Sequence, residues 1–164
     1  MSKAKKAIPE GHYTVTPQLT LDNAAQAIDW YKKALGAEEV SRATGPDGKI
    51  MHAEIRIGDS RIMLNDPMGG SKGPKALGGS PASLWLYVED CDALYNRAIA
   101  AGAQTFGPMG KMADQFWGDR CGTVSDPHGY LWTIATHKED LSPQEMKQRQ
   151  DEFFKQFAQQ PTHR

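Results

Sequence analysis

The sequence lacks the features that mark several large classes of protein. Its 164 residues include two cysteines, Cys91 and Cys121, which are too few for a disulfide scaffold and lack a metal-type spacing. No apolar run approaches the length of a membrane span. The 19 basic and 20 acidic residues leave a net charge of -1, which argues against a nucleic-acid partner. We therefore expect a cytoplasmic protein that binds neither nucleic acid nor membrane.

Glycine and proline, in contrast, are dense in residues 66–82. This stretch contains the pairs Gly69-Gly70 and Gly78-Gly79, a composition typical of a loop, and we expect a linker over 67–82 that joins two halves of the chain. It lacks the spacing and the following helix of a phosphate-binding loop. We therefore expect no nucleotide cofactor.

The same order of elements occurs on both sides of this linker, namely a strand, a helix, a short strand and a hairpin. Asp22 or Asn23 and then Asp90 are placed to begin the two helices, and Gly36 and Gly102 to end them. The expected strands are 13–21, 39–43, 83–88 and 104–106, and the expected hairpins are 50–64 and 122–135. Two copies of one βαβββ unit are the simplest interpretation, with one module over 13–66 and the other over 83–137.

The two ends of the chain differ in character. Residues 1–12 are expected to be a flexible N-terminus, and residues 138–164 a helical tail. Ser142-Pro143-Gln144-Glu145 is a capping box that predicts the start of the tail helix. Met146, Phe153 and Phe157 fall on one side of it. That side is expected to pack on its own domain or on a sister subunit, and a specific protein partner is the alternative.

The second hairpin carries the most distinctive phrases. Asp126-Pro127-His128-Gly129 supplies its turn, because proline fixes φ, aspartate bonds the backbone ahead and glycine tolerates a positive φ. Trp117-Gly118-Asp119-Arg120 precedes it as an aromatic loop that bears an arginine. The first hairpin contains His52-Ala53-Glu54.

These phrases and the duplicated unit resemble the vicinal-oxygen-chelate superfamily of glyoxalase I, extradiol dioxygenases and bleomycin-resistance proteins, and especially its PhnB-like branch. The similarity covers about residues 13–137. It implies an α+β fold in which two βαβββ modules form a cup-shaped half-barrel sheet with helices outside, here followed by a C-terminal helix. It also implies a small-molecule ligand in the cup and a homodimer.

Strand alternation predicts which side chains line that cup. The set expected to face the helices is apolar: Val15, Leu19, Leu21, Ala53, Ile55, Ile57, Leu84, Leu86, Val88, Trp132 and Ile134. The set expected to line the cup is Thr16, Gln18, His52, Glu54, Arg56, Ser83, Trp85, Tyr87, Leu131 and Thr133. Such a mixture of aromatic and polar groups is typical of a small-molecule site.

The resemblance also locates the positions at which metal-dependent members of the superfamily carry their ligands, usually histidine, glutamate or glutamine. The corresponding positions here are Thr16, a residue near Met63 to Asn65, Ser83 and Thr133. Hydroxyl groups and a thioether do not supply the imidazole and carboxylate ligands that zinc or ferrous iron needs. We therefore expect neither a metal nor another cofactor.

Two pairs of residues are candidates for the chemistry of the site. His52 and Glu54 lie two positions apart on one strand, so both point to the same side, as proton acceptors or as ordinary polar lining. Trp117 and Arg120 are expected in a loop at the mouth of the cup, where they would contact a planar or anionic ligand or simply hold the loop.

Two functions follow. In the first, the protein binds a small organic molecule without metal; its binding residues are Thr16, Gln18, His52, Glu54, Ser83, Trp85, Tyr87, Trp117, Arg120 and Thr133. In the second, it is a lyase or isomerase that acts on an oxygenated small molecule, with Glu54 or His52 as the proton acceptor. The fold hosts both binding and chemistry, so the sequence leaves the choice open.

Overall fold

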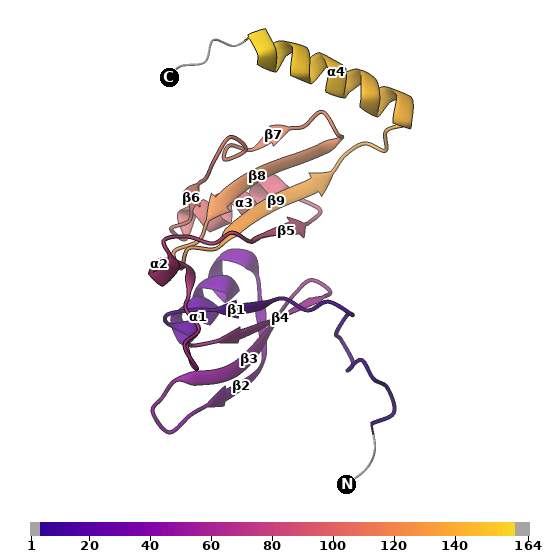
Figure 1. Ribbon diagram of the computed structural model, residues 1–164. Coiled ribbons are helices and arrows are strands. Elements are labelled where there is room, and N and C mark those ends of the chain that lie inside the picture. The colour runs from indigo at the N-terminus through magenta and orange to yellow at the C-terminus, as the bar shows by residue number, and fades with distance from the viewer. Residues whose placement is uncertain (1–3, 160–164) are drawn as a thin grey trace.

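The computed structural model describes residues 4–159, except for the side chains of residues 157 and 159. The described residues form two β-sheets, one from each half of the chain, and four helices (Figure 1). Sheet A contains β1 (Gln18–Thr20), β2 (Glu38–Thr44), β3 (Ile50–Ile57) and β4 (Ser60–Asn65). Sheet B contains β5 (Ser83–Tyr87), β6 (Gln104–Thr105), β7 (Ala113–Asp114), β8 (Asp119–Ser125) and β9 (Leu131–His137). The predicted α+β class is confirmed.

The two sheets have the same topology, which confirms the predicted duplication. Sheet A runs in the order β1-β4-β3-β2, and sheet B in the order β5-β9-β8-β6, with β7 also paired to β8. In each sheet the first strand pairs in parallel with the last, and the remaining pairs are antiparallel. Both sheets are open.

The helices begin where the sequence places their caps. In α1 (Ala24–Leu35), the side chain of Asn23 accepts a hydrogen bond from the Gln26 backbone at 3.1 Å. In α3 (Cys91–Ala100), the side chain of Asp90 accepts one from the Ala93 backbone at 2.9 Å. Each cap satisfies a backbone N–H that has no partner within its helix.

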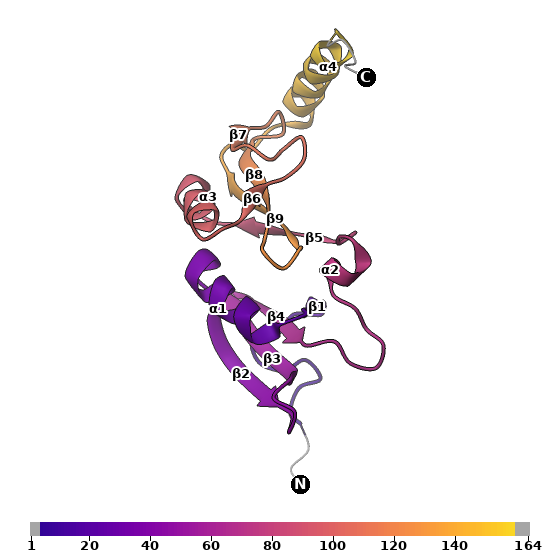
Figure 2. The same cartoon turned by 90° about the vertical axis from the view of Figure 1, so that its left-hand side faces the viewer.

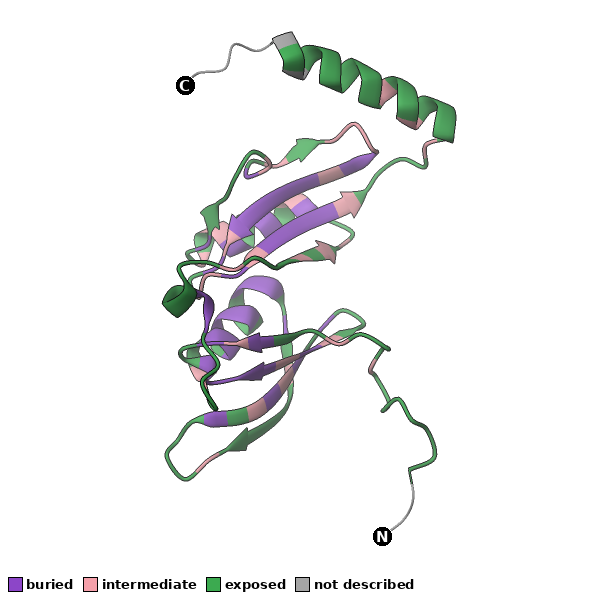
Figure 3. Ribbon diagram, in the orientation of Figure 1, coloured by how far each residue is buried: buried purple, intermediate pink, exposed green. Residues whose placement is uncertain are grey.

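Helices α1 and α3 pack on each other, and each covers one face of its own sheet (Figure 2). The strand residues beneath them are buried (Figure 3). The predicted helix-facing set is therefore largely confirmed, with Ala53, Ile55 and Ile134 fully buried. The prediction that Val15 faces the helices is wrong, because Val15 precedes β1 and is 82% exposed.

Asp126 joins the two modules. One of its carboxylate oxygens accepts hydrogen bonds from the Tyr31 hydroxyl of α1 at 2.8 Å and from the Trp132 indole of β9 at 2.9 Å. The other accepts the backbone N–H groups of His128 at 2.8 Å and Tyr130 at 3.0 Å. The Asp-Pro-His-Gly turn therefore closes its own hairpin and also fastens sheet B to the helix of the other module.

The predicted linker contains a short helix, α2 (Pro74–Leu77). The tail forms α4 (Pro143–Gln159), which lies beyond sheet B (Figure 1) and contacts the segment before β8 through Phe153, whose ring lies 5.0 Å from that of Phe116 between centroids. The capping box is confirmed, because Ser142 and Glu145 exchange backbone-to-side-chain hydrogen bonds at 2.9 and 3.3 Å. The predicted flexible segment 1–12 falls partly outside the described residues, as does the Phe157 side chain.

No helix within residues 4–159 combines the length and the apolar composition needed to cross a membrane.

Candidate functional site

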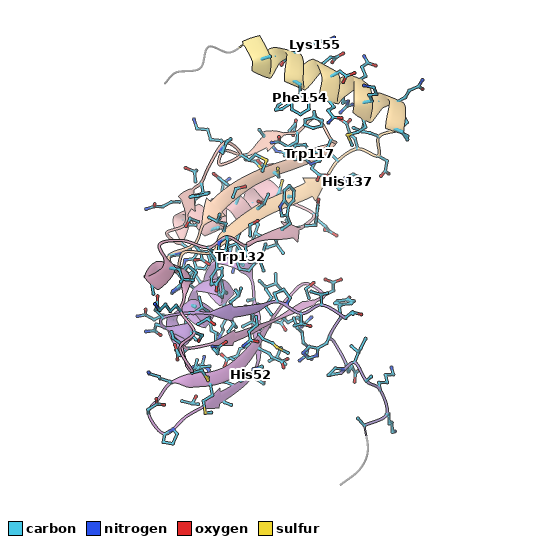
Figure 4. The ribbon with its side chains drawn as sticks, viewed as in Figure 1. His52, Trp117, Trp132, His137, Phe154 and Lys155 are labelled. Carbon is cyan, nitrogen blue, oxygen red and sulfur yellow. The ribbon has the colours of Figure 1, made fainter. Side chains whose placement is uncertain are left out.

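The structure does not bring all of the predicted ligand residues together. Eight of the ten form two groups, each on the sheet face turned away from the helices, which we call the open face; Thr16 and Arg120 belong to neither group. The sheet A group is Gln18, His52 and Glu54, and the sheet B group is Ser83, Trp85, Tyr87, Thr133 and the nearby Trp117. Figure 4 shows the separation, with His52 on the first module and Trp117 beside the end of β9 in the second.

Amide groups occupy the open face of sheet A along its edge strand β1. The Gln18 side-chain amide donates to Asn65 at 2.9 Å, and the Asn65 amide donates to the Thr20 hydroxyl at 3.4 Å. The parallel register of β1 and β4 explains this network, since it places Thr20 opposite Asn65. The amides are therefore held in defined orientations by their own neighbours.

Glu54 is the centre of an ionic cluster on the same face. Its carboxylate accepts a hydrogen bond from Nη1 of Arg61 at 2.7 Å and lies 3.4 Å from Nε2 of His52. The bond from Arg61 lowers the pKa of the Glu54 carboxyl; burial raises it, but His52 and the nearby His12 lower it further. Glu54 is therefore held as a carboxylate and is a weak proton acceptor.

His12 also belongs to this cluster, although it lies well before the first strand. Its Nε2 is 3.4 Å from Oε2 of Glu54, and its side chain is 9% exposed. Among the described residues neither ring nitrogen of His12 has a hydrogen-bond partner, and the same holds for Nε of Arg61. The cluster thus holds more hydrogen-bonding groups than its single carboxylate satisfies.

The open face of sheet B is aromatic. The ring of Trp85 lies 6.1 Å from that of Tyr87 and 6.5 Å from that of Trp117, measured between centroids. Trp85 is 43% and Tyr87 57% exposed. Aromatic groups of this size that remain open to solvent on a rigid sheet are typical of a binding surface.

Asp119 fixes the edge of this aromatic surface. Its buried carboxylate accepts hydrogen bonds from the Tyr87 hydroxyl at 2.9 Å and the Trp117 indole at 3.0 Å, and it lies 2.7 Å from Nδ1 of His137. Burial raises the pKa of Asp119, but the bonds from His137, Tyr87 and Trp117 outweigh it and lower the pKa overall. Three chain segments are thus tied to one carboxylate.

His137 completes the arrangement. Its Nε2 lies 3.0 Å from a carboxylate oxygen of Asp140, so the ring stands between two carboxylates. The contacts with Asp119 and then Asp140 raise the pKa of His137. The positive charge is therefore favoured where β9 passes into the tail.

Thr133 and Ser83 differ in accessibility. Thr133 is buried and exchanges a hydrogen bond of 2.9 Å with the Thr123 hydroxyl on the neighbouring strand. Ser83 is exposed at the start of β5. Of these two predicted ligand residues, Ser83 is the one open to solvent.

Two predicted residues occupy positions that the sequence did not suggest. Arg120 lies within β8 rather than in a loop, and its guanidinium pairs with Asp92 of α3 at 2.7 Å and with Asp114 at 3.1 Å. That places it on the helix side of the sheet. Thr16 lies before β1 and bonds to the Tyr13 carbonyl at 3.4 Å, because Pro17 delays the start of the strand.

Within the described part of the chain, no group of three or more histidine, cysteine, aspartate or glutamate side chains is arranged to hold a metal ion.

Sequence reasoning missed His12, Arg61, Asp119 and His137. Asp119 stands inside the Trp117-Gly118-Asp119-Arg120 phrase, so that phrase is the sequence signal that could have identified it. The others take part through contacts between distant segments, such as the approach of residue 12 to residue 54.

Comparisons with known proteins agree with this architecture. The family model of the glyoxalase/bleomycin resistance protein/dioxygenase superfamily matches residues 11–134. An uncharacterized protein of Mycobacterium bovis is 41% identical over 138 residues, which cover 81% of this chain and 89% of that protein. A PhnB protein from Bacillus cereus, described as a putative 3-demethylubiquinone-9 3-methyltransferase, has a TM-score of 0.57 at 17% identity and covers 76% of this chain and 99% of its own. A bleomycin resistance determinant encoded on the transposon Tn5 has a TM-score of 0.55 at 22% identity, with 79% and 99% covered. These two structures share the fold.

Proposed function

Because the chain belongs to the glyoxalase/bleomycin resistance protein/dioxygenase superfamily, we propose that it binds a small organic molecule on the open face of sheet B, without a metal. The observation that carries this proposal is the exposed aromatic surface of Trp85 and Tyr87 beside Trp117. The hydrogen bonds from Tyr87 and Trp117 to Asp119 hold two of these rings in place before a ligand arrives. A preorganised surface loses little conformational entropy on binding.

The state of Glu54 favours binding over catalysis. A general base works best when its pKa lies near the operating pH. The pKa of Glu54 is instead lowered by its hydrogen bond to Arg61, against the effect of burial. The carboxylate is therefore stabilised in the form that has little tendency to take a proton.

The alternative function is a lyase or isomerase acting on an oxygenated small molecule, with Glu54 or His52 as the proton acceptor. The observation in its favour is that both side chains lie on one open face, 3.4 Å apart. A turnover assay with the hemithioacetal of methylglyoxal and glutathione tests it. Turnover that is lost in Glu54→Gln would support the enzyme and overturn the binding proposal.

The binding proposal is tested by titrating metal-free bleomycin and following tryptophan fluorescence; bleomycin is the probe because the superfamily includes bleomycin resistance proteins. We expect saturable binding with one site per chain. Trp117→Ala should weaken it about tenfold, because an aromatic contact of about 1 kcal/mol and its buried area are lost. Trp30→Phe is the matched control, since Trp30 lies between the modules and donates to the Ala101 carbonyl. Bleomycin and a panel of planar aromatic compounds that all fail to bind would contradict the proposal.

We further propose a homodimer. Val40 and Met51 are exposed on strands of sheet A, away from the ligand surface proposed on sheet B, and they leave apolar area that association would bury. Light scattering coupled to size exclusion should give twice the chain mass, and a monomer at all concentrations would contradict this.

The domain limits 13–137 and a cytoplasmic location remain proposals as well. The location is supported by two buried free cysteines, Cys91 and Cys121, because a reducing compartment keeps such thiols unpaired.

A further inference from the structure

A cavity of about 260 Å³ lies in the seam between the two modules. It is enclosed by three parts of the chain, namely the segment 13–17, the hairpin of β3 and β4, and the strands β5 and β9 of the other module. Its lining residues are Tyr13, Val15, Thr16, Pro17, Ile57, Ser60, Arg61, Ile62, Leu84, Trp85, Leu86 and Trp132. Trp85 also belongs to the open face of sheet B, but the remainder of this lining lies outside that surface.

The walls of the cavity are apolar. Ile57 and Ile62 come from the helix-facing side of sheet A, and Leu84 and Leu86 from the corresponding side of sheet B. Trp132, which lies where the two modules meet (Figure 4) and is 1% exposed, adds an aromatic wall. An apolar enclosure of this kind favours the hydrocarbon or aromatic body of a small molecule.

Arg61 is the one charged group among the described residues of the lining. Its guanidinium makes one hydrogen bond, from Nη1 to Glu54 at 2.7 Å, while its buried Nε has no partner among the described residues. A side chain added at Gly11 would come within 2.7 Å of that Nε, so the glycine backbone packs closely on the guanidinium. The group is therefore held in place with donor capacity left over.

His12 adds to this surplus. It shares the Oε2 oxygen of Glu54 with Arg61, at 3.4 Å, and neither of its buried ring nitrogens has a hydrogen-bond partner among the described residues. A buried polar group without a partner is unfavourable, so an added hydrogen-bond acceptor would stabilise this cluster. A carboxylate is the acceptor that best matches an arginine.

We infer that the seam cavity binds a small monocarboxylic acid with an aromatic or branched apolar body. The apolar walls hold the body, and Arg61 recognises the carboxylate with His12 close behind it. The cavity is just below the usual range of about 300–1,000 Å³ for ligand sites, which restricts the ligand to one ring or a short chain. This inference does not rest on the function proposed for the open face of sheet B.

Phenylacetate is the probe, and its neutral isostere phenylacetamide is the matched control ligand. Isothermal titration of the full chain should show saturable binding of phenylacetate and at least about tenfold weaker binding of phenylacetamide, because the charge-assisted hydrogen bond is lost. In a ¹H–¹⁵N spectrum, phenylacetate should shift the indole N–H signal of Trp132.

Two pairs of variants locate the site. Arg61→Lys keeps the charge opposite Glu54 but loses the planar fork, so it should bind phenylacetate about tenfold more weakly. Arg56→Lys is its control. Arg56 lies on the same hairpin as Arg61, but it pairs with Glu38 of β2 and does not line the cavity. Val15→Asp places a negative charge at the cavity, which repels the carboxylate of phenylacetate and should also weaken its binding. Val40→Asp, on β2, should leave binding unchanged.

Val15 is exposed, so its substitution remains informative if Arg61→Lys fails to fold. Three results would overturn the inference: no saturable binding of phenylacetate, equal binding of phenylacetamide, or unchanged binding in both Arg61→Lys and Val15→Asp. Trp117→Ala should leave phenylacetate binding intact, so a failure of this inference is distinguishable from a failure of the sheet B proposal.

Discussion

Sheets A and B share one topology, but their open faces differ in chemical character. In sheet A the open face is ionic and amide-rich, and its central carboxylate, Glu54, is neutralised by Arg61. In sheet B it is aromatic, and its carboxylate, Asp119, lies at the edge, where it orients the rings of Tyr87 and Trp117 and pairs with His137. The helix-facing sides are alike because both must bury apolar area. The two modules are therefore alike on the helix-facing side, which forms the core, and differ on the open face.

The largest expected effect comes from separating the modules. Asp126→Asn places an amide donor against four hydrogen-bond donors. We expect the free energy of unfolding, measured by urea denaturation, to fall by about 2–4 kcal/mol. Asp66→Asn is the within-module counterpart, because the Asp66 carboxylate accepts the backbone N–H groups of Ala24 and Ile50, which both belong to the first module. Asp126→Asn should split the unfolding transition, whereas Asp66→Asn should leave it single. Coincident transitions in both variants would show that Asp126 is not the joint.

The next effect separates the roles of the two carboxylates. Asp119→Asn should lower stability by about 1–3 kcal/mol, because a buried acceptor of three groups is lost, and it should also weaken bleomycin binding. Glu54→Gln should leave bleomycin binding within about twofold, because Glu54 lies on the other sheet. Equal losses of binding in both variants would mean that the two open faces form one site.

A thiol reports on the interior of the aromatic side. Cys121 lies on β8, is fully buried, and has its pKa raised by burial to about 11 from 9.0, with Asp119 and Cys91 adding to the shift. Since the thiolate is the reactive form, alkylation by iodoacetamide at pH 8 should be at least about a hundredfold slower than in the unfolded chain. Rapid labelling of Cys121 in the native protein would contradict this burial.

The smallest effect is a titration. The pKa of His137 is raised above its ordinary 6.5 by Asp119 and then Asp140, so this contact stabilises the fold fully below that value and ceases to do so as the pH rises through the higher, folded-state pKa. Asp119 behaves oppositely; its contribution is present above its ordinary pKa and is lost as the pH falls through the lowered one. Proton NMR should give a raised pKa for His137 in the unmodified protein and a lower pKa for His137 in Asp140→Asn. An unchanged value in that variant would exclude the second contact.

The sequence predicts the fold well because the helix-facing side obeys strict alternation, as Ala53, Ile55 and Ile57 illustrate. It fails at Val15, where Pro17 delays the strand, and at Arg120, where β8 begins earlier than the turn signals indicate. The open faces are harder to predict. The approach of His12 to Glu54 depends on how an irregular segment crosses a sheet, and local patterns do not contain that information.

The indole N–H signals of the four tryptophans test the central claim most directly. Trp85 and Trp117 lie at the open face of sheet B, whereas Trp30 and Trp132 donate to the Ala101 carbonyl and to Asp126 between the modules. On addition of metal-free bleomycin, we expect the signals of Trp85 and Trp117 to shift with a saturable dependence while those of Trp30 and Trp132 stay fixed. Shifts confined to Trp30 and Trp132, or no shift in any of the four, would contradict binding at this face.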